Sequence, residues 1–266
     1  MPGKLGIIGC GKMGYALIKG ISSASAYTDI YACDTSSERS ELMAREFGAI
    51  PVSPEELVNN ADIIIMAVKP GQVMELLHRT AERWNEKQLL ISIAAGIKIA
   101  SIEAAVVKPL PVVRVMPNTP CLVGEGASGI AAGHYASQAD IKLVQAMMDS
   151  VGISVIVDEA YMDAITAVSG SGPAYAFLVI EAMMDAALQL GLSSDMSRQL
   201  VMQTFKGSIA MLEKTGEHPA VLKSQVTSPG GTTIAGLRKL EAEGIREAFF
   251  AALERACQRS KELGSQ

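Results

Sequence analysis

Three glycines near the amino terminus have the spacing of a turn that binds phosphate groups. The turn consists of Gly9, Cys10, Gly11, Lys12, Met13 and Gly14, which is the pattern G-x-G-x-x-G. A continuous apolar run at 4–9 predicts a buried strand before it, and the apolar spacing at 12–22 predicts a helix after it. In such a unit the first glycine makes the turn, the second lets the backbone approach a pyrophosphate, and the third lets helix and strand pack closely. Because the N–H groups at a helix start attract negative charge, we expect a dinucleotide to bind at these residues.

Asp34 ends the second predicted strand, 30–34, and follows the glycine turn by 20 residues. A carboxylate at this place usually accepts a hydrogen bond from the adenosine ribose 2'-hydroxyl, which favours NADH because it repels a 2'-phosphate. The hydroxyl of Ser36 and the guanidinium of Arg39 are instead good phosphate ligands and favour NADPH. Ser36 or Ser37 is equally suited to capping the next helix. These residues leave both cofactors open, and we take NADPH as the expected one with NADH as the alternative.

Two further loops follow predicted strands and carry residues suited to a cofactor site. The segment Ala67, Val68, Lys69 and Pro70 closes the strand 63–68, and the strand 112–116 is followed by a loop that holds Asn118. In an open parallel sheet, ligands lie beyond the carboxyl ends of the strands, so we expect both loops to border the cofactor. The amide of Asn118 is suited to the nicotinamide end or to the substrate, and a plain turn is the alternative. For Lys69 the alternative is a solvated surface position.

The order of the predicted elements indicates an α/β amino-terminal domain followed by an all-α domain. Apolar strands without polar alternation, including one at 89–94, are separated by helices, which predicts a mostly parallel Rossmann-like sheet covered on both faces. A last strand at 153–157 is expected at the edge. After about residue 159 the spacing is helical throughout. The predicted helices are 161–168, 172–190, 194–214, 219–226, 233–243 and 244–263. We therefore expect an NAD(P)-binding domain at 1–158 and a helical domain for substrate binding and dimerisation at 159–266.

Composition excludes several classes of function. The chain has 266 residues and a formal net charge of -5 with no block of like charge, so the sequence lacks the basic clusters that nucleic-acid binding needs. Its four cysteines contain no C-x-x-C pair and do not cluster with the three histidines, so neither a metal site nor disulfides are expected. The first residues run straight into an apolar strand, so we expect no export. The apolar stretch 174–184 is interrupted by Glu181 and is too short to span a bilayer. We expect a cytoplasmic protein without a membrane or nucleic-acid partner.

The loop Ser228-Pro229-Gly230-Gly231-Thr232-Thr233 precedes a predicted helix and is suited to a small anion. Unpaired N–H groups and the helix dipole attract negative charge at such a place, and the two glycines let a ligand approach the backbone. Thr232 or Thr233 can cap the helix and also offer a hydroxyl. A small carboxylate fits this loop, and an ordinary capped turn is the alternative.

The segment 219–241 around this loop closely resembles the signature of the pyrroline-5-carboxylate reductase family. Further segments that look like this family are GIIGCGKMG at 6–14, AVKPG at 67–71, SIAAG at 92–96, VMPNTP at 115–120 and VSGSGPAY at 168–175. The resemblance spans nearly the whole chain. It implies hydride transfer from NAD(P)H to the C=N bond of 1-pyrroline-5-carboxylate, which gives L-proline in the last step of proline biosynthesis. Such a reaction needs no strong catalytic base, because the cofactor supplies the hydride and a protonated imine is already electrophilic.

The resemblance also implies roles for single residues. It places Thr233 at the ring nitrogen of the substrate, and it places the amides of Gly231 and Thr232, together with Ser228, at the substrate carboxylate. Gly230 belongs to the same substrate-binding loop. In VSGSGPAY it implies that Ser171 contacts cofactor or substrate, while Gly170, Gly172 and Pro173 are expected to interrupt the entry to the long helix.

The predicted helix 174–190 is apolar nearly all round, which favours a position between subunits. The resemblance implies a homodimer through the helical domain that can assemble further. A rival interpretation is a β-hydroxyacid dehydrogenase, but such enzymes carry a catalytic lysine on this helix, and 171–190 contains no Lys, Arg or His. A non-enzymatic regulator that binds NAD(P) is a second rival, and it has no use for the anion-binding loop at 228–233.

Overall fold

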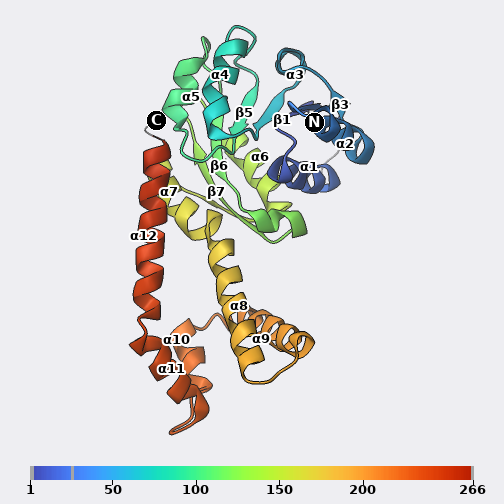
Figure 1. The fold of residues 1–266 in the computed structure, drawn as a ribbon. Helices are drawn as coiled ribbons and strands as arrows, with labels where there is room; N and C mark the ends of the chain where they lie inside the picture. Colours follow the sequence, from blue (N-terminus) through green and yellow to red (C-terminus); the bar gives the residue numbers. More distant parts are fainter. Residues whose placement is uncertain (1–2, 25–26, 265–266) are drawn as a thin grey trace. The chain divides into compact units, whose positions relative to one another are not determined.

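The structure, a computed structural model, describes residues 3–24 and 27–264 (Figure 1). The chain divides into two compact units, each of which we describe by itself. Unit 1 consists of residues 1–173 together with 255–266, and unit 2 consists of residues 174–254.

Unit 1 is built on one eight-stranded sheet with the strand order β3-β2-β1-β4-β5-β6-β7-β8. The strands are β1 (Leu5–Ile8), β2 (Ile30–Cys33), β3 (Ile50–Pro51), β4 (Ile63–Met66), β5 (Leu89–Ser92), β6 (Val112–Met116), β7 (Gly126–Ala132) and β8 (Gly152–Ile156). All neighbouring pairs are parallel except β6 with β7. This arrangement confirms the predicted Rossmann-like, mostly parallel sheet.

Alternate residues of the central strands fill two hydrophobic cores, one on each face of the sheet. Ile7 and Ile65 point to one face, where they meet helices α1 (Lys12–Ala24), α2 (Ser37–Phe47) and α6 (Gln138–Asp149). Their neighbours in the strands point to the other face and meet the remaining helices of the layer. Those helices are α3 (Pro54–Asn60), α4 (Pro70–Thr80), α5 (Ile99–Ala105) and α7 (Met162–Ile165). Burial on both faces explains why these strands are continuously apolar.

The register of the three central strands brings the predicted site loops together. Ile8 at the end of β1 pairs with Cys33 of β2 and with Met66 of β4. The glycine turn, the segment at Asp34 and the segment 67–70 therefore leave the sheet at the same edge. Ligands bind at this edge in open α/β sheets.

Two strands of the sheet were not predicted. β3 has only two residues, and β7 has the sequence GASGIAA, whose glycines and alanines carry little β-propensity. β7 is buried through its place between β6 and β8, which the local sequence does not encode. The predicted edge strand 153–157 is confirmed as β8, one residue earlier.

The described chain after β8 is helical, as predicted. The interruption expected at Gly170, Gly172 and Pro173 is present, because α7 continues into a π-helical turn at Thr166–Gly170 before α8 begins at Gly172. π-Helical turns are rare and are found frequently at functional sites. The remaining helices are α8 (Gly172–Gln189), α9 (Ser194–Thr215), α10 (Pro219–Gln225), α11 (Thr232–Ala242) and α12 (Ile245–Leu263).

Unit 2 buries almost none of its own apolar side chains in the single chain. Within 174–254, which is fully described, only Ser197 and Val201 are buried. Large exposed apolar residues of this unit include Phe177, Leu178, Met183, Leu188, Leu200, Ile209, Ile234 and Phe250. By length and composition alone, the described helical stretch Glu159–Gln189 is apolar enough to cross a membrane. Exposed apolar surface of this extent marks an interaction surface.

Candidate functional site

The three glycines of the turn between β1 and α1 lie in different surroundings. A Cβ atom at Gly9, where φ is 101°, would lie 2.5 Å from the carbonyl oxygen of Ala67, and one at Gly14 would lie 2.1 Å from the carbonyl oxygen of Gly9. A Cβ atom at Gly11 would meet no atom within 4 Å. The first and third glycines therefore permit close backbone packing, and the second faces open space. This is the arrangement that a pyrophosphate needs.

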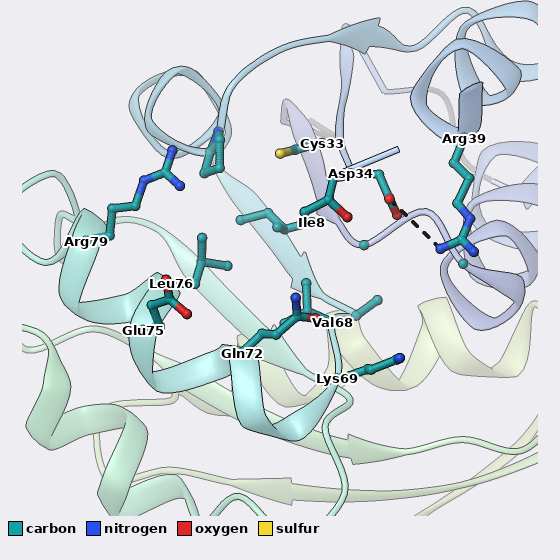
Figure 2. Close-up of a pocket in the computed structure, with 15 residues that line it drawn as sticks. Ile8, Cys33, Asp34, Arg39, Val68, Lys69, Gln72, Glu75, Leu76 and Arg79 are labelled. Carbon is teal, nitrogen blue, oxygen red and sulfur yellow. Dashed lines mark ion pairs between the residues drawn. The ribbon is translucent and has the colours of Figure 1, made fainter. Parts of the chain in front are cut away.

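A cavity of about 410 Å³ opens over the carboxyl ends of β1, β2 and β4 (Figure 2). It brings together seven predicted cofactor residues: Gly9, Gly11, Asp34, Arg39, Ala67, Val68 and Lys69. The other predicted cofactor residues, Lys12, Met13, Gly14, Ser36, Pro70 and Asn118, do not line the cavity itself. Cofactor pockets in this fold are of this size and place, so the cavity is the candidate site.

The carboxylate of Asp34 is buried and is hydrogen-bonded to the backbone. Its Oδ2 atom accepts from the N–H of Cys10 at 2.7 Å, and its Oδ1 atom accepts from the N–H of Ser36 at 2.9 Å. The guanidinium of Arg39 lies 3.9 Å from Oδ1 (Figure 2). Each carboxylate oxygen thus has a partner within the protein. Asp34 therefore fixes the shape of the glycine turn, a role separate from the expected hydrogen bond to the ribose hydroxyl.

Ser36 occupies the N-cap position of α2 but makes no side-chain cap hydrogen bond. The capping alternative therefore accounts for its backbone position and not for its hydroxyl, which is left for another partner. Arg39, in the first turn of the same helix, lines the cavity while 59% of its side chain is exposed. A hydroxyl and a guanidinium are both good ligands for a phosphate.

Two buried thiols, Cys10 and Cys33, lie close to this site, and Cys33 lines the cavity. Burial, and next the negative charge of Asp34, raise the pKa of Cys10 to about 12 and that of Cys33 to about 11. The Sγ atom of Cys10 donates to the carbonyl of Cys33 at 3.5 Å. Because the thiolate is the nucleophilic form, both cysteines are structural here.

Sequence reasoning missed one wall of the cavity. Gln72, Glu75, Leu76 and Arg79 all line it and all belong to α4, which follows Lys69 and Pro70. Their spacing of i, i+3, i+4 and i+7 puts them on one face of a helix. That spacing, directly after a site loop, was the available signal. Pro54, the first residue of α3, also lines the cavity.

Asn118 is buried, and its side-chain amide is used inside unit 1. Its Nδ2 atom donates to the carbonyl of Ser169 at 3.0 Å, and its Oδ1 atom accepts from the N–H of Ala127 at 2.9 Å. Asn118 therefore links the loop after β6 to β7 and to the π-helical turn that precedes Ser171. Its contact with the nicotinamide end stays a prediction.

The loop 228–233 lies in unit 2 and exposes backbone N–H groups at the start of α11. Gly230 has a φ of 68°, and the N–H of Gly231 donates to the carbonyl of Ser228 at 3.1 Å. The predicted capping by Thr232 or Thr233 is wrong, because the N-cap residue is Gly231 and no side chain caps the helix. Both threonines already lie in the first helical turn. The first-turn N–H groups are thus left without a side-chain acceptor, as an anion site requires.

Within the described part of the chain, no three His, Cys, Asp or Glu side chains are grouped as a metal site. The charged side chains that line the cavity are those of Asp34, Arg39, Lys69, Glu75 and Arg79.

The Rossmann sheet, its glycine turn and the cavity above them define a dinucleotide-binding oxidoreductase. Residues 4–96 match a family model described as NADP oxidoreductase, coenzyme F420-dependent, and residues 159–263 match one described as pyrroline-5-carboxylate reductase dimerisation. Over 265 residues, the chain is 44% identical to the pyrroline-5-carboxylate reductase of Methanosarcina acetivorans, covering 98% of both proteins. It is 41% identical to the enzyme of Pseudomonas aeruginosa over 266 residues, covering 99% of this chain and 97% of the relative. The chain belongs to the pyrroline-5-carboxylate reductase family.

Solved structures agree with this assignment. The structure of a Plasmodium falciparum pyrroline carboxylate reductase with NADP bound is 38% identical and has a TM-score of 0.89 over 98% of both chains. A Coxiella burnetii pyrroline-5-carboxylate reductase is 34% identical and has a TM-score of 0.88 over 97% of both chains. The family resemblance, the fold class and the NAD(P)H cofactor predicted from the sequence are thereby confirmed.

Proposed function

We propose that this chain reduces the C=N bond of 1-pyrroline-5-carboxylate with NADPH and gives L-proline, the last step of proline biosynthesis. The observation that carries the proposal is the match to reductases of this name over nearly the whole chain, which takes in both the cofactor residues and the loop 228–233. The open space at Gly11 suits the cofactor, and the uncapped start of α11 suits the substrate carboxylate. A regulator that only binds NAD(P) is disfavoured, because it has no use for the second feature.

The residues of the two units divide the work of this reaction. Bound NADPH supplies the hydride. We assign the substrate carboxylate to the N–H of Thr232 and the hydroxyl of Ser228, with Gly230 giving the loop its left-handed bend. The N–H of Gly231 joins them when it exchanges its hydrogen bond to the carbonyl of Ser228 for one to the substrate. The hydroxyl of Thr233 hydrogen-bonds to the ring nitrogen and stabilises it as its charge changes. Ser171, which follows the π-helical turn, completes the substrate residues.

The cofactor residues fit NADPH better than NADH. The carboxylate of Asp34 has a backbone partner on each oxygen and an arginine nearby, so its repulsion of a 2'-phosphate is reduced. The hydroxyl of Ser36 and the guanidinium of Arg39 then hold that phosphate. The remaining assigned residues are Gly9, Gly11, Lys12, Met13 and Gly14 at the pyrophosphate, and Ala67, Val68, Lys69, Pro70 and Asn118 toward the nicotinamide.

The protein forms a homo-oligomer, which the match to a dimerisation model over 159–263 supports. We assign residues 1–158 to cofactor binding and residues 159–266 to substrate binding and to a homodimer interface that permits further assembly. The exposed apolar side chains of α8 and α9 are then covered by a second copy instead of by lipid. All four cysteines are free, which suits a cytoplasmic protein.

The direct test mixes the purified protein with pyrroline-5-carboxylate and each reduced cofactor and follows the loss of nicotinamide absorbance. We expect imine-dependent oxidation of NADPH with formation of L-proline in equal amount. Pyrroline-2-carboxylate, which carries the double bond at the other ring position, serves as the matched control substrate. Cofactor binding without oxidation by either imine contradicts the proposal and supports the regulator.

A further inference from the structure

The cofactor cavity extends beyond the glycine turn and Asp34 to a region whose lining residues have not been assigned to any part of the cofactor. Its wall there is formed by Pro54 at the start of α3 and by one face of α4. Figure 2 shows Gln72, Glu75, Leu76 and Arg79 on that helix, on the side of the cavity opposite Arg39. The wall is apolar at Pro54 and Leu76, polar at Gln72 and charged at Glu75 and Arg79. A flat, mostly apolar group with hydrogen-bonding edges suits such a surface.

The guanidinium of Arg79 is held in a fixed plane by Glu55. Its Nη2 atom donates to Oε2 of Glu55 at 3.0 Å, and its Nε atom donates to Oε1 of the same carboxylate. The pair raises the pKa of Arg79 and lowers that of Glu55, mainly through these hydrogen bonds. Both charges also act on the pKa of Cys33 in the cavity wall, which places the pair at this end of the site. An arginine fixed in this bidentate way offers a flat face for stacking.

We propose that Arg79, held by Glu55, covers the adenine base of the cofactor and makes this end of the cavity its base-binding part. The proposal rests on the proposed function, because it takes NADPH as the occupant. The glycine turn holds the pyrophosphate, and the segment 34–39 holds the adenosine ribose and its phosphate. The base is the one remaining part of the adenosine half, and α4 lines the remaining space. Arginine stacks on aromatic rings through cation–π attraction, and Gln72 can read the edge of the base.

Binding of 2',5'-ADP by calorimetry tests this role without any turnover. We expect Arg79→Ala to raise the dissociation constant about fivefold, because one stacking contact of a partly exposed guanidinium is lost. Arg79→Lys keeps the positive charge but lacks the planar guanidinium group. Its affinity for 2',5'-ADP should therefore lie between those of Arg79→Ala and wild type. Glu55→Gln frees the guanidinium and weakens binding in the same direction. Arg83→Ala is the matched control, since Arg83 also acts on Glu55 but does not line the cavity, and it should stay within about twofold of wild type.

Reduced nicotinamide mononucleotide, which has no adenosine half, separates base binding from a general disturbance of the site. The Michaelis constant for NADPH should rise with Arg79→Ala, while that for the mononucleotide and both values of kcat stay unchanged. Equal affinity of Arg79→Ala and Arg83→Ala for 2',5'-ADP overturns the proposal. So does a rise in the Michaelis constant of Arg79→Ala for the mononucleotide that equals the rise for NADPH. Failure of the proposed function gives a different pattern, in which wild type binds 2',5'-ADP but no imine oxidises NADPH.

Discussion

Oδ2 of Asp34 accepts a hydrogen bond from the backbone N–H of Cys10 at 2.7 Å, which joins the end of β2 to the middle of the glycine turn after β1. The second oxygen of the carboxylate accepts from the N–H of Ser36. One acidic side chain thus fixes two segments that border the cofactor. Since both donors are backbone groups, the shape of the phosphate-binding turn depends on this side chain before any cofactor arrives.

Asp34→Asn is expected to weaken the binding of NADPH and of NADH equally. An amide cannot accept two hydrogen bonds from two N–H groups in this geometry, and charge-assisted hydrogen bonds of this type contribute about 1.5–3 kcal/mol each. We expect the Michaelis constants for NADPH and NADH to rise by about tenfold each, with their ratio unchanged. Steady-state kinetics with both cofactors measures this. A rise for NADH alone would show that Asp34 serves the ribose hydroxyl instead.

Arg39→Ala is expected to weaken the binding of NADPH much more than the binding of NADH. The exposed guanidinium pairs with the 2'-phosphate, which NADH lacks, and loss of a charge-assisted contact should raise the Michaelis constant for NADPH about tenfold or more. The constant for NADH should change less than about twofold. Arg45→Ala, on the exposed side of the same helix, is the matched control. Parallel losses for the two cofactors would remove Arg39 from the phosphate site.

Thr233→Ala is expected to lower kcat by roughly ten- to a hundredfold, the scale of one positioned hydrogen bond to a reacting group. Thr233→Ser keeps the hydroxyl and should recover most of the rate. Thr204→Ala is the matched control, because the Thr204 hydroxyl donates only to the carbonyl of Leu200 in its own helix. Rates of Thr233→Ala equal to wild type would show that its hydroxyl takes no part in the reaction.

The sequence predicts those parts of the fold in which local pattern and tertiary environment agree. The run 63–66 is entirely apolar and becomes a strand buried on both faces, so the pattern is sufficient. β7 is different, because its small residues have little preference of their own and its place depends on the strands beside it. Long-range pairing of this kind is not encoded in a window of neighbouring residues.

The site shows the same limit at the level of single side chains. The glycine pattern predicts the turn, but it does not reveal that Asp34 points back to the N–H of Cys10. Residue type predicts capping by Thr232 or Thr233, but the helix begins at Thr232, one residue before the predicted start, and Gly231 is its N-cap. The direction of a side chain and the exact start of a helix depend on the folded backbone.

Leu178→Asp is expected to prevent assembly. This side chain of α8 is 62% exposed in the single chain, and a charge there would face apolar surface in a homodimer. We expect light scattering after size-exclusion chromatography to show a smaller species or loss of stable protein. Glu181→Gln, on the same helix, is the control and should assemble normally. A Leu178→Asp protein that keeps its oligomeric mass would place the interface elsewhere.

Asn118→Asp is expected to lower stability in a way that depends on pH. The amide Nδ2 donates to the carbonyl of Ser169, and an ionised carboxylate cannot donate and repels that oxygen. Protonation restores the donor, so burial and the carbonyl raise the pKa of the new carboxyl above the usual value of about 3.9. A raised carboxyl pKa stabilises the fold at low pH, and this contribution is lost as pH rises through the shifted pKa.

The expected destabilisation by Asn118→Asp is therefore about 2 kcal/mol at pH 8, and it decreases as the pH is lowered toward about 5. Asn118→Ala loses both hydrogen bonds without gaining a titratable group, so its penalty relative to wild type should stay constant over the same range. Thermal unfolding of the three proteins across this pH range measures the difference. If Asn118→Asp and Asn118→Ala keep the same separation at every pH, the amide does not hold the π-helical turn through Ser169, and that turn must be stabilised by its own backbone.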